Sequence, residues 1–501
     1  MKQTMIRSMA TCAAVIASAV MLFPGAATAG PAACANRVNN THQKLLECVT
    51  LEGVREHQAA LQDIADANGG TRAAGTPGYE ASVDYVVERM TAAGYNVTLN
   101  EFPILFFAPA VLERVLPNPT TYETDRFIGT GSADVTASVT PVDINLFGDR
   151  SNTSGCEAAD FAGFPAGSIA LIQRGTCFSA VKAENAQAAG ASAVIIFNQG
   201  NTAERSGLIN GSLDPFIANI PVVDVSFATG EALAAPGTIA HVKVDEPQII
   251  VQHNVLAEST GGDPNNVVMA GAHLDSVQRG PGINDNGSGS AVILEVAEQM
   301  AKVKPRNKVR FAWWGDEESG LNGSFNYVFT LPDEELDRIA LYLNFDMVGS
   351  PNHVFFVLDG DDSDGVVGAP GPEGSGQIEK VFQAFYTSRG LPFKGLALDG
   401  RSDHAAFVQM GIPVGAIFTG AEGIKTAAEA ALWGGTAGVQ YDPCYHSACD
   451  TFDNNSDVAL DANADAAAYA ILQFAMNTQA INGKRGKGNF KLDHWGPRVN
   501  H

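Results

Sequence analysis

The stretch that decides the fold runs from Val267 to Met300 and reads VVMAGAHLDSVQRGPGINDNGSGSAVILEVAEQM. An apolar run typical of a buried strand leads into His273, and apolar residues between Ile293 and Met300 then recur at the spacing of a helix. A loop rich in glycine and asparagine separates the two, and glycine permits unusual backbone geometry there. A strand, a polar loop and a helix in this order predict one unit of an α/β domain.

The same alternation continues through the rest of the chain. The further elements that we expect are strands at Phe311–Trp314, Ile339–Phe345 and Val414–Phe418 and helices at 378–385 and 461–479. Alternating strands and helices predict an α/β fold, with a mixed, mostly parallel sheet flanked by helices.

Upstream, a helix and a strand are expected at 79–102, and after them the pattern of apolar residues changes. Between 105 and 250 helical periodicity is scarce, and short β-rich runs are separated by Gly, Pro and Asn. We therefore expect a β-rich insertion at 105–250 that divides the α/β domain into a first part at 30–104 and a second part at 251–482, followed by a flexible basic tail at 483–501.

Residues 1–29 have the pattern of a secretory signal peptide. Two basic residues precede a short apolar stretch, and Ala27-Thr28-Ala29 is a small-x-small cleavage pattern. An N-terminal membrane anchor is the alternative, but it would need a longer apolar run. The sequence thus predicts a secreted, extracellular protein that carries no transmembrane helix.

Charge and cysteine content agree with export. The formal net charge of −24 disfavours nucleic acid and anionic membrane as partners, and we expect a soluble monomer. In an oxidising compartment, paired cysteines form disulfides more readily than zinc sites. The simplest pairing of the six cysteines beyond the leader is local in sequence, namely Cys34–Cys48, Cys156–Cys177 and Cys444–Cys449.

Six acidic and imidazole residues follow apolar runs or lie in polar loops. They are His273, Asp285, Glu317, Glu318, Asp346 and His446. Each alone is commonly a cap or a surface residue, but the ends of parallel strands meet at one edge of a sheet. Five of these residues are enough to hold two zinc ions, which would leave Glu317 as a base for hydrolysis of an amide bond by metal-activated water.

Several stretches carry a family resemblance. They are GAHLDSV, GPGINDNGSGS, WWGDEESGLNGS, NFDMVGS, DGRSDH and YHSACD. With them, residues 50–104 and 252–480 resemble the secreted dizinc aminopeptidases of metallopeptidase clan MH, of the leucine aminopeptidase type. The insertion resembles a protease-associated (PA) domain, from Cys156 through Gly200. The resemblance implies the zinc exopeptidase fold and, as substrates, the N-termini of peptides and proteins.

The resemblance also implies roles for single residues. Asp285, followed by a cis peptide bond, would bridge two zinc ions. His273 and Asp346 would complete one ion, and Glu318 and His446 the other.

The remaining roles concern the reaction. Glu317 would be the general base, Tyr445 would stabilise the oxyanion, and Asp275 would orient His273. Arg401 would lie near the substrate, or else form a salt bridge with Asp399 or Asp403.

Three other functions share this fold. A carboxypeptidase or dipeptidase could use the same two metal ions, a glutaminyl cyclase would hold one zinc, and a binding relative would lack the ligands. For Asp461 and Asp465, one helical turn apart, a solvated acidic helix face is favoured over a calcium site.

Overall fold

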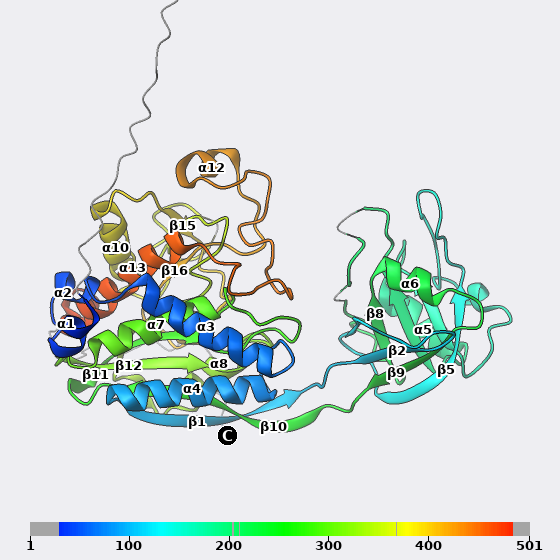
Figure 1. Ribbon diagram of the computed structural model, residues 1–501, viewed down its shortest axis with the longest axis horizontal. Coiled ribbons are helices and arrows are strands. Elements are labelled where there is room, and N and C mark those ends of the chain that lie inside the picture. Colours follow the sequence, from blue (N-terminus) through cyan, green and yellow to red (C-terminus); the bar gives the residue numbers. More distant parts are fainter. Residues whose placement is uncertain (1–29, 203–204, 210, 367, 484–501) are drawn as a thin grey trace, which may run out of the picture.

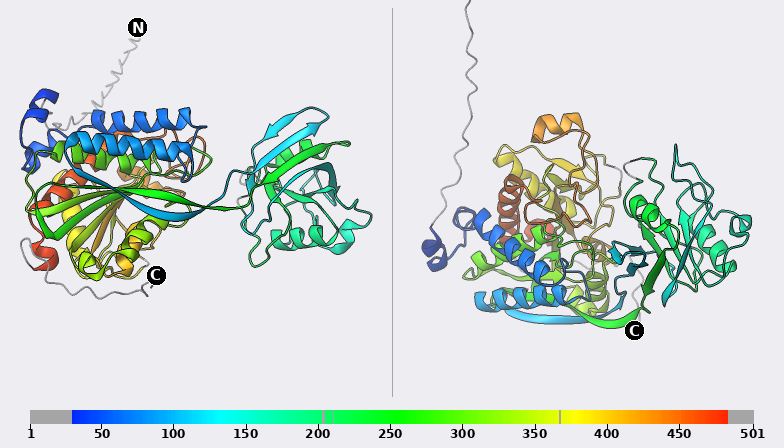
Figure 2. Two further views of the ribbon diagram at one scale, coloured as in Figure 1. Left: turned by 90° about the horizontal axis from the view of Figure 1, so that it is seen from below. Right: turned by 45° about the vertical axis from the view of Figure 1, so that its right-hand side comes forward.

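The computed structural model describes residues 30–483 apart from 203, 204, 210 and 367. The predicted signal peptide and nearly all of the basic tail lie outside this part of the chain. Two units stand apart and are joined by β1 (Asn96–Phe106) and β10 (Gln248–Glu258) (Figures 1 and 2). These two strands pair antiparallel along their whole length. Among the described residues, no helix has the length and apolar character needed to cross a membrane.

The larger unit, called the main domain below, is built on one eight-stranded sheet in the order β1-β10-β12-β11-β13-β16-β14-β15. The remaining strands are β11 (Asp263–His273), β12 (Asn307–Trp314), β13 (Ile339–Phe345), β14 (Phe356–Leu358), β15 (Lys394–Leu396) and β16 (Val414–Phe418). The central strands β12, β11, β13 and β16 are parallel, whereas β10 and β14 run antiparallel to their neighbours in that group. The predicted mixed sheet is confirmed.

Helices cover both faces of this sheet (Figures 1 and 2). One face packs against α3 (Leu51–Ala67), α4 (Pro77–Ala93), α7 (Gly287–Met300), α10 (Ser375–Ser388) and α13 (Asp457–Met476). The other packs against α8 (Asn322–Thr330) and α11 (His404–Gln409). Side chains of a strand alternate between faces, so Val268 and Ala270 of β11 enter the first core while Val267 and Met269 enter the second.

Glycine allows the close approach of α7 to β13. A Cβ atom at Gly289 would overlap the carbonyl oxygen of Phe345, the last residue of β13. The N-terminus of α7 therefore lies directly against the carboxyl end of a central strand.

The smaller unit, called the inserted domain below, has its own eight-stranded sheet in the order β3-β2-β9-β5-β6-β7-β8-β4. Its strands are β2 (Val111–Leu116), β3 (Thr120–Tyr122), β4 (Asp125–Arg126), β5 (Ala133–Val142), β6 (Ile169–Gln173), β7 (Ala193–Phe197), β8 (Val222–Val225) and β9 (Ile239–Val244). Strands β5 to β8 are parallel. The helices α5 (Ser179–Ala188) and α6 (Phe227–Leu233) contribute to separate cores on its two faces.

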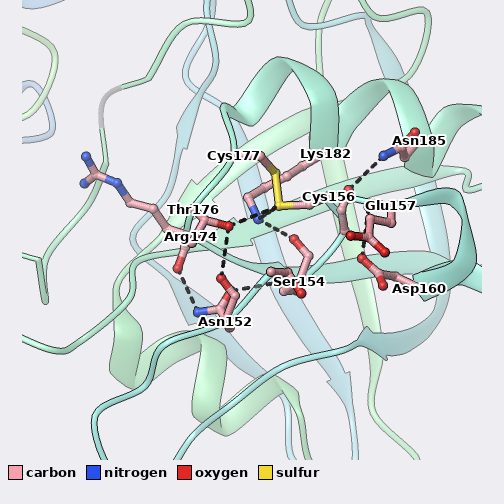
Figure 3. Close-up of a disulfide and its surroundings, with 12 residues drawn as sticks. Asn152, Ser154, Cys156, Glu157, Asp160, Arg174, Thr176, Cys177, Lys182 and Asn185 are labelled. Atoms are coloured by element: carbon pink, nitrogen blue, oxygen red, sulfur yellow. Dashed lines mark hydrogen bonds between the residues drawn. A yellow bond between two sulfur atoms is a disulfide. The ribbon is translucent and has the colours of Figure 1, made fainter.

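Three disulfides join the sequence-local pairs Cys34–Cys48, Cys156–Cys177 and Cys444–Cys449. Figure 3 shows the second of these in the inserted domain. Buried Lys182 donates a hydrogen bond to the carbonyl oxygen of Ser154 beside it.

Candidate active site

The six singled-out residues lie together although the sequence spreads them widely. Strands β11, β12 and β13 are neighbours, and their carboxyl ends carry His273, the Glu317-Glu318 pair and Asp346. Asp285 lies in the loop before α7, and His446 lies in the loop closed by the Cys444–Cys449 disulfide. Each therefore comes from a segment anchored by a buried element or a crosslink.

Asp285 lies between two imidazoles. Its Oδ1 is 3.2 Å from Nε2 of His273, and its Oδ2 is 3.3 Å from Nε2 of His446. Around His273 are also Asp346 Oδ1 at 3.5 Å and Glu317 Oε2 at 3.9 Å. His446 has Glu318 Oε2 at 2.9 Å. Two groups of donor atoms thus share one carboxylate.

The donor atoms suit metal ions. Glu318 Oε1 and Asp346 Oδ1 are buried atoms with no hydrogen-bond partner, although unsatisfied buried carboxylate oxygens are unfavourable. Ligand atoms of His273, Asp285 and Glu318, and of His273, Glu317 and Asp346, lie within 4.8 Å of one another. Imidazole and carboxylate are the ligands of catalytic zinc sites.

Electrostatics mark the cluster as a cation site. Burial lowers the pKa of His446, but the hydrogen bonds from its ring to Asp285 and Glu318 outweigh burial and raise the pKa to about 10. For His273 the carboxylates of Glu317 and Asp346 likewise outweigh burial, so its pKa lies well above the ordinary value. The carboxylates thus attract positive charge to this place, and a bound metal ion would take the place of the protons, because only a neutral imidazole can bind a metal.

Glu317 lies in a less favourable setting for a charge. Burial raises the pKa of its carboxyl group well above the ordinary value; His273 opposes this rise, and Asp346 and Glu318 add to it. A carboxyl group with a raised pKa can both accept and return a proton near neutral pH.

Asp275 connects the first histidine to the glutamate pair. Its carboxylate accepts hydrogen bonds from the backbone N–H groups of Glu317 at 3.1 Å and of Glu318 at 3.3 Å. Nδ1 of His273, the nitrogen that faces away from the cluster, lies 3.1 Å from the backbone carbonyl oxygen of Asp275 and 3.6 Å from its Oδ1. One residue can therefore orient three of the candidate residues through its carboxylate and its carbonyl group.

Asp450 holds Asp285 in place, and sequence reasoning gave Asp450 no role. Its two oxygens accept the backbone N–H groups of Asn284 at 2.8 Å and Asp285 at 2.9 Å. The peptide bond between Asp285 and Asn286 is cis, as the family resemblance implied. Burial raises the pKa of Asp450 to about 8. The signal for this residue was its place in the YHSACD stretch, directly after Cys449.

A chain of hydrogen bonds reaches Asp346 from the core, and the sequence did not reveal it either. Trp314 Nε1 donates to the hydroxyl of Tyr342 at 2.8 Å, which donates to Asn344 Oδ1 at 2.7 Å. Asn344 then donates to Ser402 Oγ at 2.8 Å, and Ser402 donates to Asp346 Oδ2 at 2.6 Å. Because this oxygen is engaged, Oδ1 is the one left free to bind a ligand.

A cavity of about 340 Å³ opens at the cluster. Besides the candidate ligands, its walls include apolar side chains of β16, together with Tyr445, Arg401 and His404. Arg401 pairs with Glu422 at 2.9 Å, which corrects the alternative of a salt bridge to Asp399 or Asp403. Its other terminal nitrogen lies 3.5 Å from the hydroxyl of Tyr445.

Other acidic groups have partners of their own. Asp465 forms an ion pair with Arg389, which lies at the C-terminus of α10. The negative charge of Asp465 is therefore already paired with a cation of the chain. For Asp461 and Asp465 the sequence favoured a solvated acidic helix face, and the calcium alternative stays untested.

Comparison with known proteins places this site in a family. Residues 254–471 match the model of peptidase family M28, and residues 135–233 match the PA domain. An aminopeptidase of Pseudomonas aeruginosa is 50% identical over 448 residues, which are 87% of this chain and 83% of that protein. A probable lipoprotein aminopeptidase of Mycobacterium tuberculosis is 41% identical, with 87% of each chain covered. The structure of a zinc aminopeptidase from Bacillus subtilis aligns with a TM-score of 0.61 at 25% identity, covering 84% of this chain and 94% of that one.

Proposed function

The chain belongs to peptidase family M28 and is an aminopeptidase of that family, and from this premise we propose that it is a secreted enzyme that removes N-terminal residues from peptides and proteins with the help of two zinc ions. One observation carries the proposal. The two oxygens of Asp285 lie 3.2 and 3.3 Å from two imidazoles, and each imidazole has a further carboxylate beside it. A single zinc site, as in a cyclase, would not need this second set of ligands.

Five residues would hold the two ions. Asp285 would bind both, His273 and Asp346 would complete one site, and Glu318 and His446 the other. Zinc ions bound there would supply Lewis acidity, which activates water and polarises the scissile carbonyl group.

Glu317 would move the proton. Its carboxylate is 10% exposed and lies 3.9 Å from His273 Nε2, at the rim of the cluster and next to the cavity. From this position it can take a proton from the attacking water and give it to the leaving amine. The backbone bond from its N–H group to Asp275 would keep the carboxylate in place.

Tyr445 would act on the carbonyl oxygen. Burial raises the pKa of its hydroxyl above the ordinary value, so the group stays protonated and can donate a hydrogen bond to a developing oxyanion. Its ring stacks on that of His446 with centroids 3.8 Å apart, so one loop positions both side chains. Arg401 beside Tyr445 would contact the substrate at the cavity rim.

The excess of carboxylates accounts for attack at the first peptide bond. A free α-ammonium group would be attracted to this acidic site, whereas the C-terminal carboxylate of a peptide would be repelled. The cavity also encloses a limited volume, which suits one terminal side chain. The signal-peptide pattern and the three disulfides support the proposed secretion.

The test uses the secreted full-length enzyme and three matched peptides that begin with leucine: one free at both ends, one N-acetylated and one amidated at the C-terminus. We expect release of free leucine from the first and the third, no reaction of the second, and two zinc ions per chain by metal analysis. Cleavage from the carboxyl end would support the carboxypeptidase alternative. One zinc ion in fully active enzyme would contradict the two-zinc proposal.

A further inference from the structure

The inserted domain carries a second feature, away from the metal cluster. Its strands β5, β6, β7 and β8 are parallel neighbours, so their carboxyl ends meet at one edge. In open sheets of this kind, ligands bind at that edge. The loops that follow β5, β6 and β7 contribute one arginine each, namely Arg150, Arg174 and Arg205.

Hydrogen bonds hold these loops together. The side-chain amide of Asn152 donates to the backbone carbonyl oxygens of Arg150 at 3.0 Å and of Arg174 at 3.1 Å. The N–H group of Gly200 donates to the carbonyl oxygen of Arg205 at 2.6 Å, and the guanidinium group of Arg150 donates to Gly200 in turn. The three arginines therefore belong to one structured edge.

All three guanidinium groups lack an acidic partner among the described residues, but their surroundings differ. Arg150 lies over the ring of Phe227, 4.0 Å from its centroid, and has a structural role. Arg174 donates one hydrogen bond to Asn198 Oδ1 at 3.3 Å, and Arg205 has a buried Nε with no hydrogen-bond partner. Neither forms an ion pair with any acid in the described part of the chain. Burial and the nearby charge of Arg205 both lower the pKa of Arg174, so the two like charges lie close together.

Exposed aromatic rings accompany this charge. Phe147 follows β5 and is 81% exposed, and Phe178 follows β6 and is 85% exposed. In Figure 3 the side chain of Arg174 extends away from the Cys156–Cys177 disulfide, which anchors the loop that ends at Phe178. Figure 1 shows the chain between β7 and β8 on the side of the inserted domain that faces the main domain.

We propose that this edge, made of Arg174 and Arg205 with Phe147 and Phe178, binds carboxylate groups of a polypeptide substrate whose N-terminus lies in the active site. The inference rests on the proposed function. Guanidinium groups match carboxylates through paired hydrogen bonds, and aromatic rings beside them favour peptide over small inorganic anions. In a chain of net charge −24, two arginines that form no ion pair within the described residues would favour substrates with acidic residues or a free C-terminus at the matching distance.

The experiment compares two series of peptides of increasing length that begin with leucine. One series carries Asp and Glu downstream and a free C-terminus, and the other carries Asn and Gln and a C-terminal amide. Leucyl-p-nitroanilide, which has no downstream segment, reports the catalytic site alone. The variants are the double substitution Arg174→Gln with Arg205→Gln, and Lys243→Gln as a matched control. Lys243 lies in the same domain, and its charge is already paired with Asp245 at 2.9 Å.

We expect the double variant to lower kcat/KM about tenfold on acidic peptides of sufficient length, through KM, because charge-assisted contacts are lost. Its kcat/KM on the amide series and on the nitroanilide should stay within about twofold of the parent, and Lys243→Gln should change none of the three. Equal losses in both series, or no loss at any length, would overturn the proposal. If the parent enzyme cleaves none of these substrates, the proposed function fails. The affinity of the longest acidic peptide, measured by calorimetry, then tests the binding edge by itself. Equal affinities of the parent and the double variant would refute the proposed binding of carboxylates there.

Discussion

Replacing Glu317 by Gln tests the proposed chemistry most directly. The two side chains are nearly the same size, and the backbone N–H group of residue 317 would keep its hydrogen bond to Asp275. Nothing in the packing should change, and the five candidate ligands are untouched. What the variant loses is the ability to accept a proton from water.

The expected loss follows from that single role. General-base catalysis contributes about 10² to 10⁴ in rate, which corresponds to about 3 to 5 kcal/mol in the activation barrier. The loss should appear in kcat, whereas KM should change little because the carboxylate is assigned to the attacking water and not to a contact that binds the substrate. Zinc content should stay at two ions per chain.

Glu318→Gln is the matched control, because the two residues are neighbours of the same type. Its Oε2 lies 2.9 Å from His446 Nε2 and its Oε1 has no other partner, so the substitution should weaken metal binding. Steady-state kinetics on leucyl-p-nitroanilide with and without added zinc would separate the two variants. Added zinc should partly restore Glu318→Gln and should not restore Glu317→Gln. Near-normal kcat in Glu317→Gln, or its rescue by zinc, would refute the assignment.

Three further predictions concern stability and positioning. Arg72→Met removes a fully buried guanidinium group that donates to three carbonyl groups of the loop 274–282, and urea titration should show a loss of about 3 kcal/mol or more; an unchanged midpoint would contradict this. Replacing Cys444 and Cys449 by Ser opens a loop whose ends are only five positions apart in sequence, so we expect a loss of stability of about 2 kcal/mol but a marked fall in zinc content, and full zinc content would be the contrary result. Burial raises the pKa of Glu295 to about 7 from an ordinary 4.5, so ionisation of its carboxyl group destabilises the native state as pH rises through this range. Glu295→Gln should therefore be more stable than the parent by up to about 3 kcal/mol at pH 8 and equally stable below pH 4.5. The opposite pH trend in urea titrations would contradict this reasoning.

Much of the main domain could be predicted because its central strands are buried on both faces. Such strands are continuous apolar runs, as at Ile339–Phe345, and the helices between them show regular apolar spacing. The helix α3 was not predicted, because no periodic apolar pattern was recognised in its sequence. The strand β10, which pairs with β1, lies across the expected domain boundary at residue 250. In the inserted domain α5 is rich in alanine and polar residues, so it lacks the clear apolar stripe of a surface helix.

The candidate ligands were easier to predict than the residues that hold them. Imidazole and carboxylate side chains beside strand ends are visible in sequence, whereas a supporting contact depends on a partner far along the chain. Asp450, for example, is 165 residues from Asp285, whose N–H group it binds. Arg72 is 202 residues from the carbonyl group of Leu274. Neither pairing leaves a local pattern in the sequence.

The supporting residues also indicate why the proposed site would need cations from outside the chain. Beyond the candidate ligands, the buried acids Asp275, Asp403 and Asp450 surround the cluster, and buried Arg72 is a positive group of the chain set among them. Burial raises the pKa of Asp403 to about 7 and that of Asp450 to about 8, which reflects how poorly the site tolerates further negative charge. Two divalent ions would offset this excess in a way that protons on two histidines cannot. Because ligand binding stabilises the folded state, the acidity that suits the site for catalysis would also couple the folding of these loops to metal binding.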